Sequence, residues 1–324
     1  MRWLITGGCG FIGINLIHRL LEHPASQIQV LDNLSVGTTE ALASVAEYVE
    51  GETMQADARV TLTQGDILDV ELVNKVCGSA DVVVHLAANT GVHQSVMNPG
   101  LDCDINVVGT QNMLSAAHKA GCSRFVFASS GAPVGEVEPP IHEELAPHPV
   151  SPYGASKLAG EGYCSAYFRT YGLETVALRF GNIYGPRSAH KSSVVAKFIT
   201  QMINGELLEV YGSGNQTRDF IYIEELVRAV EQAASVPGIG GEIFQIASNR
   251  ETTVNELVDL LQEVAVGLGV AVPEVFYSDP RLGDVMRNYS DTSKARSRLG
   301  WSSSIDLRQG LQSTFEWFLQ NRSQ

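Results

Sequence analysis

Short apolar runs alternate with amphipathic segments along the first half of the chain. The apolar runs predict buried strands at Arg2–Thr6, Ile28–Asp32, Val60–Gln64, Asp81–Leu86, Arg124–Ser129 and Glu174–Phe180. The segments between them predict helices at Phe11–His23, Thr38–Val49, Val70–Val76, Asn106–Ala120 and Tyr153–Tyr171. Strands that are apolar throughout and separated by helices are typical of a parallel sheet covered on both faces. The pattern therefore predicts an α/β protein with a doubly wound parallel sheet, whose ligand binds at the carboxyl ends of the strands.

The alternation loosens after Phe180, where Gly, Pro, Ser and Asn interrupt shorter elements. Helical patterns recur at Val194–Asn204, Glu224–Ala234, Val254–Val266 and Leu307–Leu319. We expect residues 1–180 to form the sheet domain and residues 181–324 to form a smaller mixed α/β lobe, partly threaded back into the first. Three large apolar residues are assigned to the core rather than to a ligand: Phe276, Tyr277 and Trp301.

The composition is that of a globular chain with a large core, since 44% of the 324 residues are hydrophobic and 18% are charged. A net charge of −14 argues against nucleic acid or an anionic membrane as the main partner. No window approaches about 18 consecutive apolar residues and no targeting segment is visible, so we expect a cytoplasmic protein. The five cysteines lack metal-ligand spacing, so we expect reduced thiols and no metal site.

Glycines cluster where the first predicted strand meets the first predicted helix, at Gly7, Gly10 and Gly13. They allow a tight turn, a close approach of backbone N–H groups to a pyrophosphate, and close packing of the helix on the sheet. Asp32 ends the second predicted strand, 19 residues beyond Gly13, where a carboxylate that binds adenosine ribose hydroxyls is expected. The three residues after Asp32 include no arginine to hold a 2′-phosphate, so the pattern favours NAD over NADP. Taken alone, the glycine loop and Asp32 are each compatible with an ordinary turn.

The Gly-x-x-Gly-x-x-Gly spacing resembles the extended branch of the short-chain dehydrogenase/reductase superfamily. Gly65-Asp66-Ile67 and His85-Leu86-Ala87-Ala88, after the third and fourth predicted strands, fit the same branch. The resemblance implies a Rossmann fold that binds NAD. The cofactor-binding residues that it implies are Gly7, Gly10, Phe11, Ile12, Gly13, Asp32, Asn33, Ser35, Gly37, Asp66, Ile67, Leu86, Ala87, Ala88, Thr90, Asn106, Tyr153 and Lys157. For Asn106, a plain helix cap is the alternative.

Tyr153 and Lys157 are four residues apart at the start of a predicted helix, which places them on one face, about one turn apart. An ammonium beside a phenol favours the phenolate, so we expect Lys157 to pull the pKa of Tyr153 down from about 10 towards neutrality. Such a phenolate takes a proton from a sugar hydroxyl while a hydride leaves the same carbon. An isolated Tyr-x-x-x-Lys pair is more often a solvated helix face, but this one follows a nucleotide-binding loop.

The family's Ser-Ser-x-x-x-Tyr-Gly pattern, counted back from Gly135, identifies Ser130 as the third catalytic residue. Ser129 is expected to point into the strand packing. In related 4,6-dehydratases and decarboxylases an acid follows this position, whereas Gly131 and Ala132 cannot transfer protons. The resemblance therefore limits the chemistry to oxidation and reduction at one carbon. Pro133-Val134 departs from the family's usual Val-Tyr.

Three fragments of the second lobe, residues 179–186, 212–220 and 280–284, resemble nucleotide-sugar epimerases. Together with Ser130 they imply a substrate site of Ser130, Asn182, Arg218, Arg281 and Asp284. Two arginines on a diphosphate make fork-like, charge-assisted contacts, although each alone is compatible with a surface ion pair. The basic loop 187–193 either contacts a phosphate or carboxylate or is simply solvated, and both alternatives stay open.

The resemblance covers nearly the whole chain and implies an NAD-dependent epimerase similar to UDP-glucose 4-epimerase. In the implied mechanism Tyr153 removes the C4 hydroxyl proton while NAD takes the C4 hydride. The 4-keto sugar then turns, and hydride returns to its opposite face without net redox. A nucleotide-sugar reductase or dehydrogenase with net redox is the main alternative, and a non-catalytic NAD-binding protein is another.

The same family pairs its subunits through helices that correspond to Asn106–Ala120 and Tyr153–Tyr171, so we expect a homodimer. The small and apolar residues on these helices face either a partner or their own core: Ala116, Ala117, Ala159, Cys164 and Tyr167. The identity of the sugar, the base and the pathway stays open.

Overall fold

A parallel sheet forms the centre of the computed structural model, which describes residues 1–189, 193–280 and 285–322. In this part of the chain the sheet has eight strands in the order β12-β7-β6-β5-β1-β2-β4-β3, and every neighbouring pair is parallel. The strands are β1 (Arg2–Thr6), β2 (Gln27–Asp32), β3 (Val49–Glu50), β4 (Val60–Gln64), β5 (Val82–His85), β6 (Arg124–Ser130), β7 (Thr175–Phe180) and β12 (Glu242–Ile246). The predicted α/β class with a doubly wound parallel sheet is confirmed.

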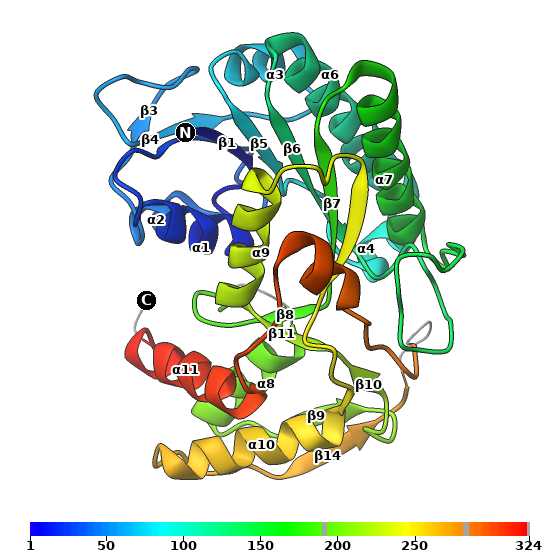
Figure 1. Cartoon of the computed structure of the whole chain (residues 1–324). Helices are drawn as coiled ribbons and strands as arrows, with labels where there is room; N and C mark the ends of the chain where they lie inside the picture. The colour runs from blue at the N-terminus through cyan, green and yellow to red at the C-terminus, as the bar shows by residue number, and fades with distance from the viewer. Residues whose placement is uncertain (190–192, 281–284, 323–324) are drawn as a thin grey trace.

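Helices cover both faces of the sheet (Figure 1). Side chains alternate across β1, so that Trp3 and Ile5 pack with α1 and α9, whereas Leu4 packs with α3, α6 and α7. These helices are α1 (Phe11–Leu20), α3 (Val70–Cys77), α6 (Thr110–Ala120), α7 (Pro152–Tyr171) and α9 (Ile223–Ser235). Because both faces are covered, central strands such as β1 and β5 carry apolar side chains on both sides, which explains their continuous apolar runs.

The connection from β5 to α6 is helical over most of its length. It consists of α4 (Val92–Met97), α5 (Pro99–Cys103) and a π-helical segment, η1 (Asp104–Gly109). The helix predicted at Asn106–Ala120 therefore begins inside a π-helix. Asn106 lies in the middle of η1 and caps no helix end there, so the alternative of a plain helix cap is wrong.

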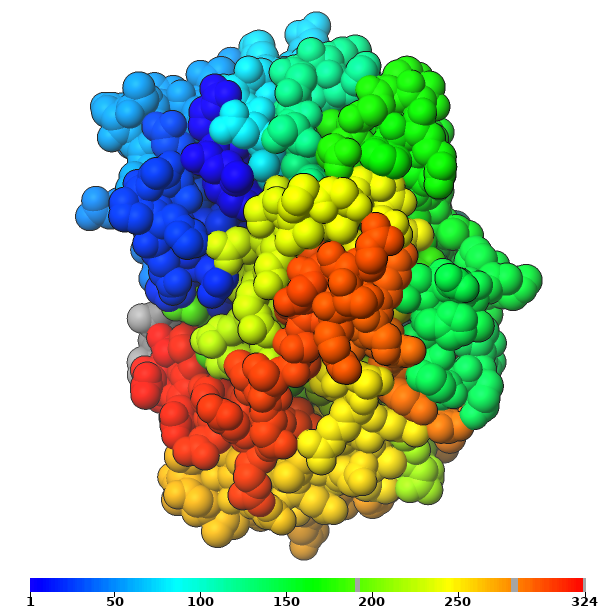
Figure 2. Space-filling model, viewed as in Figure 1, coloured from blue at the N-terminus to red at the C-terminus, as the bar shows by residue number. Residues whose placement is uncertain are grey.

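A second, smaller core lies below the sheet in Figure 1, where α8, α10 and α11 pack around short strands. Its elements are β8 (Asn182–Tyr184), α8 (Val194–Asn204), β9 (Leu208–Tyr211), β10 (Thr217–Arg218), β11 (Phe220–Tyr222), β13 (Thr252–Thr253), α10 (Val254–Gly267), β14 (Val275–Ser278) and α11 (Leu307–Gln320). The chain between these elements returns to the large sheet, where it adds α9 and β12. Near the C-terminus, η2 (Ala295–Leu299) contacts both α9 and β12. In Figure 2 the orange segment that contains η2 lies beside the yellow part of the chain. The division at residue 180 stays a prediction.

Two predictions about local structure are wrong. The helix predicted at Thr38–Val49 is only α2 (Thr39–Ala43), because Val49 and Glu50 pair with β4 and become the edge strand β3. Phe276 and Tyr277 lie on β14 with more than half of their surface exposed, so they are not core residues. The pairing of β14 with β9 places both side chains at the surface of the small lobe. Trp301 is buried as predicted.

No helix within the described ranges is long and apolar enough to cross a membrane.

Candidate active site

The glycine loop connects β1 to α1 and packs tightly on its neighbours. Gly7 has φ +66°, and a Cβ there would lie 2.8 Å from the backbone nitrogen of Ala87. A Cβ on Gly13 would lie 2.5 Å from Gly8 Cα, so only glycine lets α1 start this close to the loop. Gly10 is the N-cap of α1 and brings no side chain to its N–H groups. A helix N-terminus of this kind favours a phosphate group.

Asp32 lies at the carboxyl end of β2 and is 7% exposed. Its Oδ2 accepts a hydrogen bond from Cys9 N at 2.9 Å and its Oδ1 accepts one from Leu34 N at 2.8 Å, and burial raises the pKa of its carboxyl. A Cβ on Gly37 would lie 2.4 Å from Cys9 C, so the loop after β2 packs against the glycine loop. This contact brings the predicted cofactor residues of the two loops together.

Three further predicted cofactor residues, Asn33, Asp66 and Ala87, make hydrogen bonds at the same edge of the sheet. Asn33 Nδ2 donates to Asp66 Oδ2 at 2.9 Å, which joins the ends of β2 and β4. Ala87 N donates to Thr6 Oγ1 at 3.2 Å, which joins β5 to β1. The cradle of glycines, the helix N-terminus and the Asp32 carboxyl fit a dinucleotide with two ribose hydroxyls on its adenosine. These residues would hold it, and their individual roles stay predictions.

The predicted catalytic trio of Ser130, Tyr153 and Lys157 lies where β6 ends and α7 begins. Ser151 caps α7 by accepting a hydrogen bond from Gly154 N, and Pro152 occupies the first turn, so Tyr153 stands at the helix N-terminus. Lys157, one turn later, is 3% exposed, and its Nζ donates to Ala128 O at 3.0 Å. Ser130, at the end of β6, is hydrogen-bonded to Tyr153. The predicted trio is therefore brought together.

The electrostatics of the pair differ from the prediction. Burial raises the pKa of Tyr153 to about 12, only partly offset by the Ser130 hydrogen bond, and burial also lowers the pKa of Lys157 to about 8. The expectation that Lys157 draws the pKa of Tyr153 towards neutrality is thus wrong for this structure. Its Nζ lies 5.9 Å from the centroid of the Tyr153 ring and is directed at a backbone carbonyl. Loss of hydration outweighs the pair's attraction, since burial opposes both charged forms.

A buried ion pair beside the trio was not predicted. Arg179, on β7, donates two hydrogen bonds to the Glu161 carboxylate, each 2.7 Å long. Ser129 also donates to Glu161, at 2.6 Å, which confirms that Ser129 points into the packing. Glu161 follows Lys157 by four residues, so the helical period was a usable signal, but the partner on β7 was not visible from it.

The predicted substrate residues are only partly described. Asn182 is exposed at the start of β8. Arg218, on β10, donates to Thr217 O at 2.6 Å and to Val285 O at 2.7 Å. Arg281 and Asp284 lie outside the described residues, as do residues 190–192 of the loop 187–193. In the described part of that loop, Arg187 donates to Asn15 Oδ1 at 3.1 Å, so it contacts α1.

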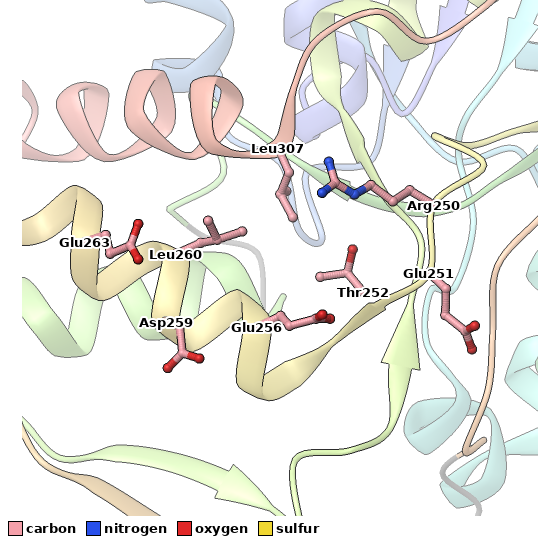
Figure 3. A pocket seen from close by; sticks show the side chains of 8 residues that line it. All are labelled: Arg250, Glu251, Thr252, Glu256, Asp259, Leu260, Glu263 and Leu307. Atoms are coloured by element: carbon pink, nitrogen blue, oxygen red, sulfur yellow. The ribbon is translucent and has the colours of Figure 1, made fainter.

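A cavity of about 290 Å³ opens in the small lobe, between the start of α10 and the start of α11 (Figure 3). Figure 3 shows that carboxylates predominate among its side chains, with one guanidinium from Arg250. Arg250 pairs with Asp306 at 3.3 Å. The lining residues are Arg250, Glu251, Thr252, Glu256, Asp259, Leu260, Glu263 and Leu307. They include none of the predicted catalytic or cofactor residues, which lie at the carboxyl edge of the sheet.

The glycine loop, the acid after β2 and the Ser130, Tyr153 and Lys157 cluster together define a Rossmann-fold protein of the short-chain dehydrogenase/reductase type. Residues 3–247 match the model of the NAD dependent epimerase/dehydratase family. The chain belongs to this family, and NAD is the cofactor on which the family depends.

Relatives in this family carry out more than one reaction. The chain is 36% identical to the UDP-glucose 4-epimerase of Mycolicibacterium smegmatis over 330 residues, which cover 100% of both chains. It is 34% identical to a dTDP-glucose 4,6-dehydratase of Streptomyces antibioticus, over 100% of this chain and 94% of that enzyme. A crystal structure of UDP-glucose 4-epimerase from Thermotoga maritima with UDP-glucose superposes with a TM-score of 0.89, at 35% identity, and covers 100% of both chains.

Proposed function

We propose that the protein epimerises a UDP-sugar at C4, through a transient 4-keto sugar and without net redox. The observation that carries this proposal is the pair Gly131 and Ala132, directly after Ser130. Dehydration needs a group that moves a second proton, and neither residue has one. An intact Ser130, Tyr153 and Lys157 cluster without such an acid supports epimerisation over the dehydratase reaction of other relatives.

The chain's own residues hold and move the C4 proton. In its phenolate form, the oxygen of Tyr153 receives the proton of the C4 hydroxyl and later returns it, while Ser130 donates a hydrogen bond that orients the same oxygen. Lys157 remains protonated at neutral pH, because its pKa of about 8 is still above 7. We propose that its positive charge offsets part of the rise that burial causes in the pKa of Tyr153. Bound NAD would supply the reversible hydride acceptor for C4.

For the substrate, a nucleoside diphosphate with uracil as its base is the proposed ligand, because the Thermotoga maritima neighbour was crystallised with UDP-glucose. Arg218 donates hydrogen bonds to two backbone carbonyls, and Asn182 is exposed at the start of β8, which pairs with β11, the strand that follows β10. We propose that these two residues contact the phosphates and the sugar, together with Arg281 and Asp284.

We also propose that the protein is a homodimer. Of the candidate contact residues, Ala116, Ala117 and Cys164 are buried in their own core and cannot serve. Other apolar side chains on η1 and α7 are exposed instead, including Val108 at 45% and Tyr171 at 54%. Tyr171 extends an aromatic cluster across α6 and α7, with its ring centroid 4.9 Å from that of His118. Exposed apolar surface of this kind is typical of an interface.

The test is proton NMR of the purified protein with UDP-hexoses, UDP-N-acetylhexosamines and UDP-hexuronates, without added NAD. Appearance of the C4 epimer of one sugar would support the reaction and identify the sugar, and it would show that NAD is retained. A change that requires stoichiometric NAD or NADH would favour the net-redox alternative. Formation of a 4-keto-6-deoxy sugar would contradict the argument from Gly131 and Ala132.

A further inference from the structure

A buried carboxylate lies behind the catalytic pair. Asp102 is in α5, one turn before Asn106, and is 1% exposed. Its Oδ2 has no hydrogen-bond partner among the residues that the structure describes. Burying a carboxylate without a cation or a full set of hydrogen bonds is costly, so its position calls for a role.

Asp102 belongs to a network that connects three segments of the site. Its Oδ1 accepts a hydrogen bond of 2.9 Å from the side-chain amide of Asn106. The same amide donates to Asn89 O and to Ser156 Oγ, and its oxygen accepts from Asn89 N at 2.8 Å. Ser156 in turn donates to the backbone oxygen of Tyr153 at 3.0 Å. The loop after β5, η1 and the first turn of α7 are thereby tied together.

The charge of Asp102 reaches both members of the catalytic pair. It raises the pKa of Lys157, which burial lowers. It also raises the pKa of Tyr153, which burial raises as well. Glu161 also raises the pKa of Lys157, but its carboxylate is paired with Arg179. Burial keeps His85, on β5, neutral at pH 7 by lowering its pKa to about 3. The titratable and charged groups around the pair are thus Asp102 on α5, His85 on β5, Glu161 and Cys164 on α7, and Arg179 on β7.

We propose that Asp102 is a positioning residue of the reaction: its buried carboxylate fixes the amide of Asn106, which ties the loop after β5 to the first turn of α7, and its charge acts on the ammonium of Lys157. The part that concerns the reaction rests on the proposed function. The part that concerns Lys157 depends on the fold alone and is tested without any substrate.

The first experiment measures the titration of Lys157 by NMR of protein labelled with ¹³C at the lysine ε-carbons, with the resonance assigned by its loss in Lys157→Met. The wild-type midpoint is expected near pH 8. Asp102→Asn keeps the shape and an acceptor for Asn106 but removes the charge, so the midpoint falls by about one pH unit, a tenfold change in proton affinity. Asp104→Asn, an exposed neighbour in η1, is the control and leaves the midpoint unchanged.

The second experiment compares the pH profiles of turnover. A negative charge raises the pKa of every neighbouring group, so its removal moves both limbs of the Asp102→Asn profile to lower pH. A merely structural role would lower the height of the profile and leave the limbs in place. If the wild type converts no sugar, the proposed function fails, whereas the Lys157 titration still decides the role of Asp102.

An unchanged Lys157 midpoint in Asp102→Asn would overturn the proposal. Asp102→Ser, which is also uncharged and offers an oxygen to Asn106, provides the same measurement if the first variant does not fold. Failure of both variants to fold would count against the proposal too, because the carboxylate would then hold the fold itself rather than Lys157.

Discussion

Tyr153 is a poor base in this structure, so the groups around it must lower its pKa before it can accept a proton. With a pKa of about 12 the phenol stays protonated at neutral pH. A positive charge close to the phenol oxygen is what lowers such a pKa, and Lys157 is the cation one turn away on α7. The site therefore depends on keeping a buried ammonium charged, although burial works against it.

Removing the Tyr153 hydroxyl tests its role directly. We expect Tyr153→Phe to keep its bound NAD and to lose about 10²–10⁴-fold in turnover, the usual contribution of a positioned acid or base. Turnover is followed by NMR and NAD is quantified after denaturation. Tyr163→Phe, which changes an exposed tyrosine of the same helix, should match the wild type. Near-normal turnover in Tyr153→Phe would contradict the assignment.

His85 makes stability depend on pH. It is buried between Thr6 Oγ1, 2.7 Å from Nδ1, and Thr110 Oγ1, 3.1 Å from Nε2. Burial lowers its pKa from 6.5 to about 3. Between about pH 3 and pH 6.5 the His85 imidazole is protonated in the unfolded chain and neutral in the folded protein. His85 therefore lowers the free energy of unfolding as the pH falls below 6.5, by at most about 1.4 kcal/mol per pH unit.

Urea unfolding at pH 7 and pH 5 measures this effect. In His85→Asn the loss of stability on acidification should be smaller than in the wild type, whereas the exposed His93→Asn should behave like the wild type. Equal losses in the wild type and His85→Asn would show that His85 does not contribute.

At the scale of elements, α7 carries two of the three proposed catalytic residues, so the way in which it packs on the sheet determines where they lie. The Arg179–Glu161 pair and the Ser129 hydrogen bond attach it to β7 and β6. Close contact is possible because Gly160 faces Phe127 of β6, where a Cβ would lie 2.4 Å from Phe127 Cζ. The glycine allows the helix to approach the strand that ends in Ser130.

Adding one methyl group should therefore move the helix. We expect Gly160→Ala to destabilise the protein by about 1–3 kcal/mol, as overpacking does, and to lower turnover because Tyr153 and Lys157 shift with α7. Gly267→Ala on α10 is the control: its methyl would meet no atom within 4 Å, so stability should stay within about 0.5 kcal/mol. Urea unfolding and NMR turnover measure both effects. A Gly160→Ala variant as stable and active as Gly267→Ala would show that the contact does not set the position of α7.

At the scale of the whole molecule, the proposed homodimer predicts a mass twice the 34.9 kDa of one chain. Val108→Glu places a charge in the exposed apolar surface of η1 and α7, and burying that charge against a partner would be costly. We expect it to release monomers, as measured by light scattering at matched concentrations. Met286→Glu, which changes an exposed methionine in the small lobe, should leave the dimer intact. A wild-type monomer would refute the homodimer.

The alternation of apolar runs and amphipathic segments was enough to predict the class of fold, because a strand covered on both faces is apolar throughout. The glycine loop, Asp32 and the Tyr153–Lys157 pair were visible for a similar reason: their chemistry depends on spacing within one or two consecutive elements. The helices α8, α10 and α11 were also predicted within one residue of their observed ends, since each has one apolar face.

Contacts between distant segments could not be predicted in this way. Only the tertiary structure shows that β12 joins the large sheet, that Val49 and Glu50 leave a predicted helix to pair with β4, and that Arg179 reaches Glu161. The hydrophobic periodicity of a segment indicates which of its faces are buried, but it does not indicate which other segment packs against them. For the same reason the sequence determined which residues are candidates for the chemistry, whereas packing decided their charge, because the pKa values of Tyr153 and Lys157 follow from burial that many distant side chains create together.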